Sequence, residues 1–486
     1  MKKINLKKTW FSHVREDVLS GMTVSLALIP EAISFAIIVG VDPMVGLYAS
    51  FCIALTISIF GGRPAMISAA TGAMALVMVS LVKLHGIEYM FAATILTGII
   101  QFVLGKLRTG ELIHFVPHSV VLGFVNSLAI LIFMAQIPHF WGESIAMYAV
   151  VAGTLVIVYG LPRITKVVPS PLIAIIVMTV ASVLLRLDIR TVGDMGNITR
   201  SLPPFHLPNI PLSFETFKII LPYSITLSIV GVLESLLTAT IVDEMTDSKS
   251  DMSQEVKGQG IANVVAGLFG GMAGCAMIGQ SVINVKTGGR TRLSTFVSGG
   301  FLIFLILVLG DVVKVIPMAA LVGVMIMVSI STFEWDSIMS MPKLPLSCNI
   351  EMIATMVIVV STHNLAYGVL VGTAISAIVF AYKATCIDGT EHEVTHDDTL
   401  YHVYRIQGQL YFASVAKFKG LFDYKIDVEH VIIDFKNAHL WDHSAMVALN
   451  KVKEKYEEYG KKVSIVALNS ESSEKVIKLY DSQILE

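Results

Sequence analysis

Two carboxylates lie inside long apolar segments of the chain, where an ionised side chain is costly. Glu31 lies in the run TVSLALIPEAISFAI, and Glu234 lies in the run TLSIVGVLESLLTAT. A charge at the centre of a bilayer costs roughly 2.5–3.5 kcal/mol, so each glutamate is a candidate functional residue. On a helix, Thr238 shares a face with Glu234, and a carboxylate beside a hydroxyl suits Na⁺. The same glutamate can instead carry a proton, because burial favours the neutral carboxyl group. The alternative is a neutral, hydrogen-bonded structural glutamate.

A glycine-interrupted stretch in the second half of the chain predicts a broken membrane helix. It reads GIANVVAGLFGGMAGCAMIGQSVINVKTGG, residues 260–289. The apolar piece after the glycines is too short to cross a bilayer, which takes roughly 20 residues. Broken helices occur in hydrocarbon only where they line a cavity or are buried in protein. A half-helix that begins there points unpaired N–H groups and a positive dipole end at the cavity, where an anion can bind.

The first half of the chain has a matching stretch. Gly61-Gly62-Arg63-Pro64 precedes AMISAATGAMALVMVSL, in which a short apolar helix is expected from about Thr71. Discontinuous helices at corresponding places in two halves indicate the binding site of a transporter. The alternative is that both stretches are small-residue surfaces for helix packing.

The composition indicates a protein that crosses the membrane many times. Hydrophobic residues make up 54% of the 486 residues and charged residues only 15%, whereas soluble proteins are nearer a quarter charged. The four cysteines, Cys52, Cys275, Cys348 and Cys386, show no metal-ligand spacing. We interpret them as small hydrophobic residues rather than a disulfide framework.

Apolar segments predict about fourteen spans, seven in each half. They lie near 18–38, 42–60, 66–82, 88–105, 117–137, 144–161 and 169–185, and near 217–241, 257–270, 275–285, 293–310, 312–331, 350–364 and 366–383. Because each half has an odd number of spans, the two halves are expected to be inverted repeats, about 15–186 and 215–385. Together they form a transmembrane domain over residues 1–385. Basic residues in the predicted inner loops place both termini in the cytoplasm, with the protein in the cell inner (plasma) membrane.

After Lys383 the composition changes. A polar linker is expected from Asp388 to Thr399, followed by the strand-like runs LYHVYRI, GQLYFAS, HVIIDF and KKVSIVAL. Helical patterns near 413–422, 444–459 and 470–481 complete a small α/β domain, residues 390–486. His392 to His396 fits the zinc motif H-E-x-x-H, but the flanks indicate linker rather than the stable helix that this chemistry needs.

The chain resembles the sulfate permease (SulP) family of anion transporters over nearly its whole length. The resemblance is carried by residues 29–51, by SAATGAMA and by the run from Glu244 to Ser294, and VIIDF followed by DHSA resembles a STAS domain. It implies an α-helical membrane protein with seven-plus-seven inverted repeats, as in uracil permeases. A core domain would carry the anion between the third and tenth half-helices, and a gate domain would stay fixed. The family is typically dimeric, so a homodimer is expected.

The resemblance also implies site residues. Phe35 matches an aromatic residue that lines the anion pocket, and Glu234 with Thr238 resembles the cation site of Na⁺-coupled bicarbonate members. The half-helix starts match Ala70, Thr71 and Gly72 in the first half and Ala276, Met277 and Ile278 in the second.

Three positions depart from the family pattern. Ile278 stands where the bicarbonate members offer a hydroxyl, which leaves Na⁺ coupling open. Gln280 stands where many animal members carry Arg, so helix ends would have to supply the positive field. Glu31 stands where many members have Gln, and a carboxylate would repel an anion unless it were protonated. We therefore hypothesise that Glu31 binds a proton together with the anion.

Ser444 matches the position that is phosphorylated in STAS-type anti-sigma antagonists, which makes it a candidate regulatory residue. The alternative is that Asp442 or Ser444 caps the following helix.

The sequence thus predicts a secondary-active transporter of bicarbonate or sulfate, coupled to Na⁺ or H⁺, with elevator-type alternating access. If the protein is a transporter of another kind, the alternative is an anion exchanger or a dicarboxylate symporter. From another class, the chain could be a membrane sensor or scaffold that signals through the STAS domain and a cytoplasmic protein partner. No nucleophile–base pair supports an enzyme, and no nucleic acid, metal or cofactor beyond the coupling ion is expected.

Overall fold

A computed structural model describes residues 9–111, 116–164, 169–196, 199–211, 213–396 and 399–469. The chain divides into two compact units, residues 1–373 and 374–486. The first is helical, and the second contains a four-stranded sheet.

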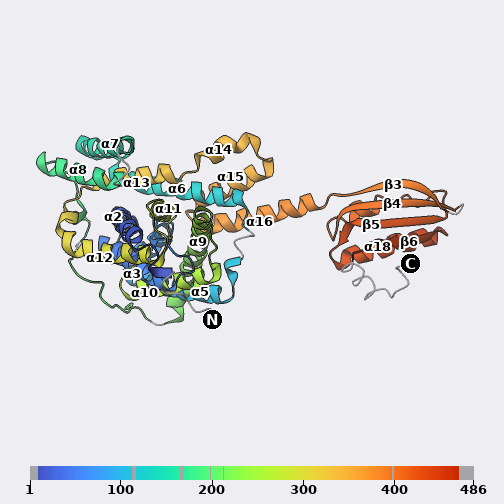
Figure 1. The fold of residues 1–486 in the computed structure, drawn as a ribbon, viewed down its shortest axis with the longest axis horizontal. Coiled ribbons are helices and arrows are strands. Elements are labelled where there is room, and N and C mark those ends of the chain that lie inside the picture. Colours follow the sequence, from blue (N-terminus) through green and yellow to red (C-terminus); the bar gives the residue numbers. More distant parts are fainter. Residues whose placement is uncertain are drawn as a thin grey trace. The chain divides into compact units, whose positions relative to one another are not determined.

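The apolar runs of the first unit form its helices, since a helix satisfies every backbone hydrogen bond within one segment (Figure 1). They are α2 (Val14–Val39), α3 (Pro43–Phe60), α4 (Gly72–His85), α5 (Ile87–Lys106), α6 (His118–Phe140), α7 (Ile145–Gly160), α8 (Ser170–Leu184), α9 (Phe214–Thr246), α10 (Met252–Leu268), α11 (Ile278–Lys286), α12 (Arg292–Lys314), α13 (Met318–Thr332), α14 (Trp335–Ser340), α15 (Leu346–Thr362) and α16 (Leu365–Ala384). Each apolar segment expected from the sequence overlaps a helix, but those at 66–82 and 275–285 also overlap short strands near their starts, Ser68–Ala70 and Gly274–Ala276. Within the described residues, nine helical stretches are long and apolar enough to cross a bilayer, and the number of spans stays a prediction.

The helices of this unit pack as two groups. In the first bundle (α2 to α5 and α9 to α12), α10 packs on α3 and α5, and α12 packs on α2 and α3. In the second bundle (α6 to α8, α13 and α15), α6 packs on α13 and α15, and α7 packs on α8 and α13. Glycine allows the closest of these approaches, because a Cβ on Gly98 of α5 would lie 2.4 Å from the carbonyl oxygen of Gly260 in α10.

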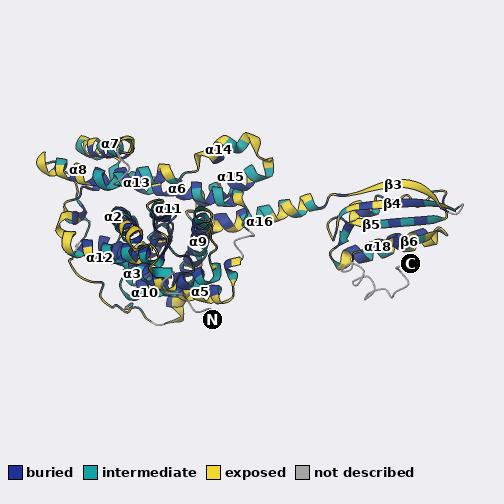
Figure 2. Cartoon of the chain, in the orientation of Figure 1, coloured by how far each residue is buried: buried dark blue, intermediate teal, exposed yellow. Residues whose placement is uncertain are grey.

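Exposure differs between these helices. Most residues of α3 are buried, whereas α7 and α8 carry many exposed residues (Figure 2). Among these are the apolar residues Val156 and Val180. Apolar surface of this kind suits contact with lipid. The pattern agrees with a unit that is embedded in a membrane.

A short sheet joins the two glycine-rich stretches. Strand β1 (Ser68–Ala70) pairs antiparallel with β2 (Gly274–Ala276), and Ala69 lies opposite Cys275. Both strands are fully buried. The residue after each strand is the N-cap of a short helix, Thr71 for α4 and Met277 for α11. The two predicted broken helices therefore begin side by side inside the protein.

The second unit has the strand order β3 (Ile387–His396), β4 (Thr399–Leu410), β5 (His430–Leu440) and β6 (Lys462–Val466). β3 and β4 are antiparallel, and the other two pairs are parallel. Helices α17 (Val415–Lys419) and α18 (His443–Glu458) pack with the sheet around a core that includes Tyr404, Phe418, Phe435 and Tyr456.

Two sequence expectations for this unit are wrong. The segment expected as linker forms β3, in which His392 pairs with Val403. His392 and His396 are therefore four residues apart on a strand, roughly 13 Å, which is too far for one zinc ion. The runs LYHVYRI and GQLYFAS form one strand, β4, which is irregular between Arg405 and Gln407 and ends at Leu410. The expected helix near 470–481 lies outside the described residues.

Candidate functional site

A cavity of about 510 Å³ lies between the two bundles of the first unit. Of the side chains that the structure describes, the charged ones that line it are Glu31, Glu234 and Lys286, which belong to the first bundle. Among the described residues, the second bundle lines the cavity without a charged side chain, through α6, α13 and the start of α8. The cavity thus has one polar wall and one largely apolar wall.

The starts of α4 and α11 meet at the polar wall. Thr71 and Met277, the two N-caps, line the cavity together with Gly72 and Ile278. At the start of α4, the Thr71 hydroxyl accepts a long hydrogen bond of 3.5 Å from the backbone N–H of Met74. At the start of α11, the side chain of Met277 accepts no such hydrogen bond. Two positive helix ends therefore face one cavity, which is a favourable environment for an anion.

The other predicted anion-site residues divide into lining and supporting positions. Phe35 lines the cavity and packs over the start of α4, since a Cβ on Gly72 would lie 2.9 Å from its ring. Ala70 and Ala276 end the two strands and are buried, and neither is among the lining residues. They hold the helix starts in place rather than facing the cavity.

Glu31 and Gln280 form a polar pair across the cavity wall. The side-chain amide of Gln280 in α11 donates a hydrogen bond of 2.8 Å to Oε1 of Glu31 in α2. Gln280 Oε1 is buried and has no hydrogen-bond partner among the described residues. Two of the three positions that depart from the family pattern, Glu31 and Gln280, therefore contact each other.

Glu234 has a partner that the sequence analysis missed. The Cys275 thiol lies 2.8 Å from Glu234 Oε2, and its sulfur lies 3.1 Å from the hydroxyl of Thr71. The Thr238 hydroxyl instead donates to the backbone carbonyl of Glu234 at 2.7 Å, and Thr238 does not line the cavity. Cys275 is a free, buried cysteine of the hydrophobic core, as we interpreted it, and it also contacts Glu234 and Thr71. Its position next to Ala276 placed it near the predicted site, but nothing in the local sequence indicated its contact with Glu234.

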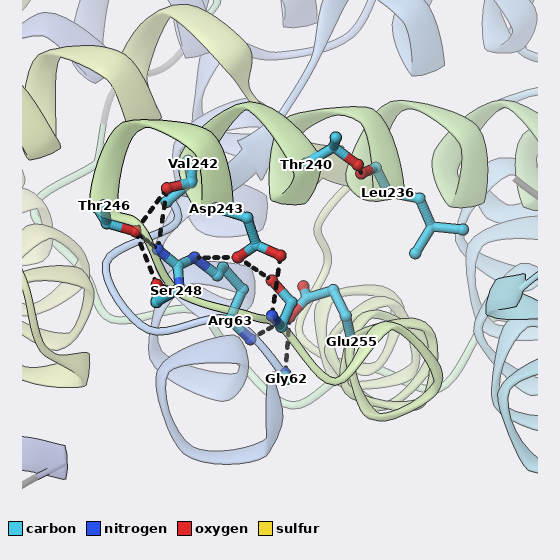
Figure 3. A network of polar contacts seen from close by, with 10 residues as sticks. Gly62, Arg63, Leu236, Thr240, Val242, Asp243, Thr246, Ser248 and Glu255 are labelled. Carbon is cyan, nitrogen blue, oxygen red and sulfur yellow. Dashed lines mark hydrogen bonds and ion pairs between the residues drawn. The ribbon is translucent and has the colours of Figure 1, made fainter. Parts of the chain in front are cut away.

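A second polar cluster lies around the loop between α3 and β1 (Figure 3). The buried Arg63 forms an ion pair of 3.3 Å with Asp243 and donates to the hydroxyl of Ser248 at 2.7 Å. Glu255 of α10 accepts hydrogen bonds from the backbone N–H groups of Gly62 and Arg63, at 2.7 and 3.0 Å. This cluster fixes the loop that leads into β1 against α9 and α10.

In the second unit, Ser444 is exposed in the first turn of α18. Asp442 is the N-cap, and its carboxylate accepts a hydrogen bond of 2.9 Å from the N–H of Ala445. Asp442 therefore provides the cap, and phosphorylation of Ser444 stays a prediction.

Many apolar helices around a central cavity, with two helix ends directed at it, define a multi-pass membrane transporter for an anion. The sequence profile of the sulfate permease family matches residues 14–155 and 144–358, and that of the STAS domain matches residues 392–482. The chain belongs to the sulfate permease family, as the sequence resemblance predicted. This membership indicates a transporter rather than an enzyme.

Named relatives agree with this assignment. The chain is 58% identical over 467 residues to "Putative sulfate transporter YbaR" of Bacillus subtilis (strain 168), covering 96% of this chain and 97% of the relative. It is 27% identical over 362 residues to "Bicarbonate transporter BicA" of Picosynechococcus sp., covering 68% of this chain and 63% of the relative.

Two solved structures are similar. The transmembrane domain of a cyanobacterium bicarbonate transporter BicA matches with a TM-score of 0.68 and 26% identity, covering 74% of this chain and 98% of that one. The overall structure of SLC26A9 matches with a TM-score of 0.83 and 18% identity, covering 100% and 89%. The fold class, a helical membrane transporter followed by a STAS domain, is confirmed.

Proposed function

We propose that this chain is a secondary-active transporter of an inorganic anion, bicarbonate or sulfate, coupled to Na⁺ or H⁺. The observation that carries the proposal is the cavity into which the N-termini of α4 and α11 open beside the carboxylate of Glu234. Helix ends attract an oxyanion, and a carboxylate beside them suits a cation that is transported with it. Names of relatives support both anions, as sulfate and bicarbonate transporters.

Movement of the first bundle past the second would give alternating access. The charged lining residues and both helix ends belong to the first bundle, so the anion and the cation would travel with it. The largely apolar lining of the second bundle offers few polar contacts to break during such a movement.

We further propose a plasma-membrane homodimer with both termini in the cytoplasm, and a regulatory role for Ser444.

Uptake into proteoliposomes tests the proposal. Radiolabelled bicarbonate and sulfate would be offered to the purified full chain under an imposed Na⁺ or pH gradient. We expect accumulation that follows one gradient and is lost in Glu234→Gln, which keeps the shape of the side chain but not its charge. Glu16→Gln, an exposed position in the first turn of α2, is the matched control and should behave as wild type.

The outcomes separate the alternatives. Anion exchange without accumulation under either gradient would favour an exchanger over a symporter. If neither labelled anion entered the vesicles or exchanged, the proposal would be overturned.

A further inference from the structure

Cys275 connects the carboxylate of Glu234 to the hydroxyl of Thr71. Its sulfur lies 2.8 Å from Glu234 Oε2 and 3.1 Å from Thr71 Oγ1. Cys275 is fully buried, and its pairing with Ala69 fixes its backbone between the two half-helices. Glu234 and Thr71 both line the cavity, whereas Cys275 does not. One buried thiol is thus in contact with the candidate cation ligand and with a candidate anion ligand.

The direction of these hydrogen bonds depends on the state of Glu234. A thiol and a hydroxyl each carry one hydrogen, and an ionised carboxylate only accepts. When Glu234 is ionised, the thiol donates to its Oε2, and the Thr71 hydroxyl donates to the sulfur. When a proton or Na⁺ occupies that oxygen, the thiol turns to donate to Thr71 Oγ1. The hydroxyl hydrogen of Thr71 is then released toward the cavity.

We propose that Cys275 is a positioning residue that relays occupancy of Glu234 by the coupling cation to the hydroxyl of Thr71. The relay rests on the proposed function and explains how cation and anion would bind together. Cation binding supplies the anion with one more hydrogen-bond donor at the start of α4. By thermodynamic reciprocity, the bound anion then favours the bound cation.

In the part of the chain that the structure describes, few other ionisable groups face this site. Of the elements packed on α9, β2 supplies Cys275, and α11 supplies Lys286 to the cavity lining. α4 supplies Gly72 and its N-cap Thr71, and none of the described lining residues comes from α5 or α10. Glu31 of α2 lines the same cavity and can also bind a proton. The relay must therefore be tested in the wild type and in a Glu31→Gln background.

The test compares how the KM for anion uptake depends on the coupling cation. The probe is labelled bicarbonate or sulfate, whichever the wild type accumulates, with the full chain in proteoliposomes at low and high Na⁺ and at acidic and alkaline pH. In the wild type we expect KM to fall roughly tenfold as the coupling cation saturates. Cys275→Ser keeps a donor and an acceptor, so the dependence should remain. Cys275→Ala removes the relay, so KM should no longer respond to the cation.

Two controls make the result specific. Cys52→Ala changes another buried cysteine, in α3 and outside the cavity lining, and should match the wild type. Thr71→Val removes the released donor, so its KM should be high and independent of the cation even if Cys275→Ala does not fold.

Retention of the wild-type cation dependence in Cys275→Ala or in Thr71→Val, or its loss in Cys275→Ser, would overturn the relay while leaving transport itself in place. A wild type that neither accumulates nor exchanges either anion would overturn the proposed function instead.

Discussion

At the scale of single residues, the cavity brings together side chains that the sequence keeps far apart. Glu31 contacts Gln280, and Glu234 contacts Cys275. The sequence singled out Glu31 and Glu234, because ionisable residues are rare and costly inside apolar segments. It could not predict the thiol contact, because Cys275 has no local feature that distinguishes it from a packing residue. Its partners lie 41 and 204 residues away, on other elements.

Glu31 tests the proton hypothesis. In Glu31→Gln, we expect proton-driven accumulation of the anion to be lost while anion exchange continues, because the amide cannot bind a proton but still fills the site. Uptake under an inward pH gradient, compared with exchange at equal pH on both sides, measures this. Glu16→Gln serves again as the control, and proton-driven accumulation that persists unchanged in Glu31→Gln would contradict the hypothesis.

At the scale of elements, the two half-helices depend on the short sheet between them. The sequence predicted the helix starts correctly, since glycines and small residues mark the interruptions. It did not predict the pairing of β1 with β2, because three-residue strands of small residues carry no alternating pattern. The sequence also failed to predict β3. This edge strand has described side chains that are mostly exposed and polar, so its sequence lacks the alternation of apolar and polar residues that a half-buried strand shows.

Gly274 should not tolerate a side chain. A Cβ there would lie 2.0 Å from the carbonyl oxygen of Ala69, in the paired strand. We expect Gly274→Ala to force the strands apart at a cost of roughly 1–3 kcal/mol, to lower the Tm and to abolish uptake. Gly300→Ala in α12, where a Cβ meets nothing within 4 Å, is the matched control for Tm and uptake. Wild-type uptake by Gly274→Ala would show that the pairing is not needed.

Arg63 should stabilise the loop that leads into β1. Arg63→Ala would leave Asp243 without its buried cation, at a cost of roughly 3–5 kcal/mol. We expect a clear fall in the Tm of the purified chain in a thermal scan. Arg200→Ala removes an exposed ion pair with Asp311 and should leave the Tm almost unchanged. Equal effects of the two substitutions would contradict a special role for the buried cluster.

At the scale of the whole molecule, the chain combines a membrane unit with a sheet-containing unit that has its own hydrophobic core. The residues that line the cavity all lie in the membrane unit. From the composition change after Lys383 we expected a boundary near that residue, because the apolar segments end there, whereas the chain divides between residues 373 and 374, within α16. The sequence motif for the STAS domain and its match over residues 392–482 agree on its identity.

Removal of residues 390–486 should therefore leave anion uptake measurable, at a reduced rate or a reduced amount of folded protein. Uptake per folded molecule in proteoliposomes is the measurement, with fluorescence size-exclusion chromatography to count folded protein. The Ser444→Ala full chain is the companion variant and should retain uptake. Complete loss of uptake by well-folded truncated protein would favour a sensor or scaffold that acts through the STAS domain.

The pairing of β1 with β2 also has a consequence for biosynthesis. The two strands are separated by roughly two hundred residues, so the ribosome releases the first long before the second exists. Helix α4, which follows β1, is too short to span a bilayer unaided. Until β2 has been synthesised, the N-terminus of α4 therefore has no paired strand beside it. During that time, α2 and α3 or the insertion machinery must shield its unpaired N–H groups from lipid. Only when the second half of the membrane unit arrives can the strands pair and the cavity acquire both of its helix ends.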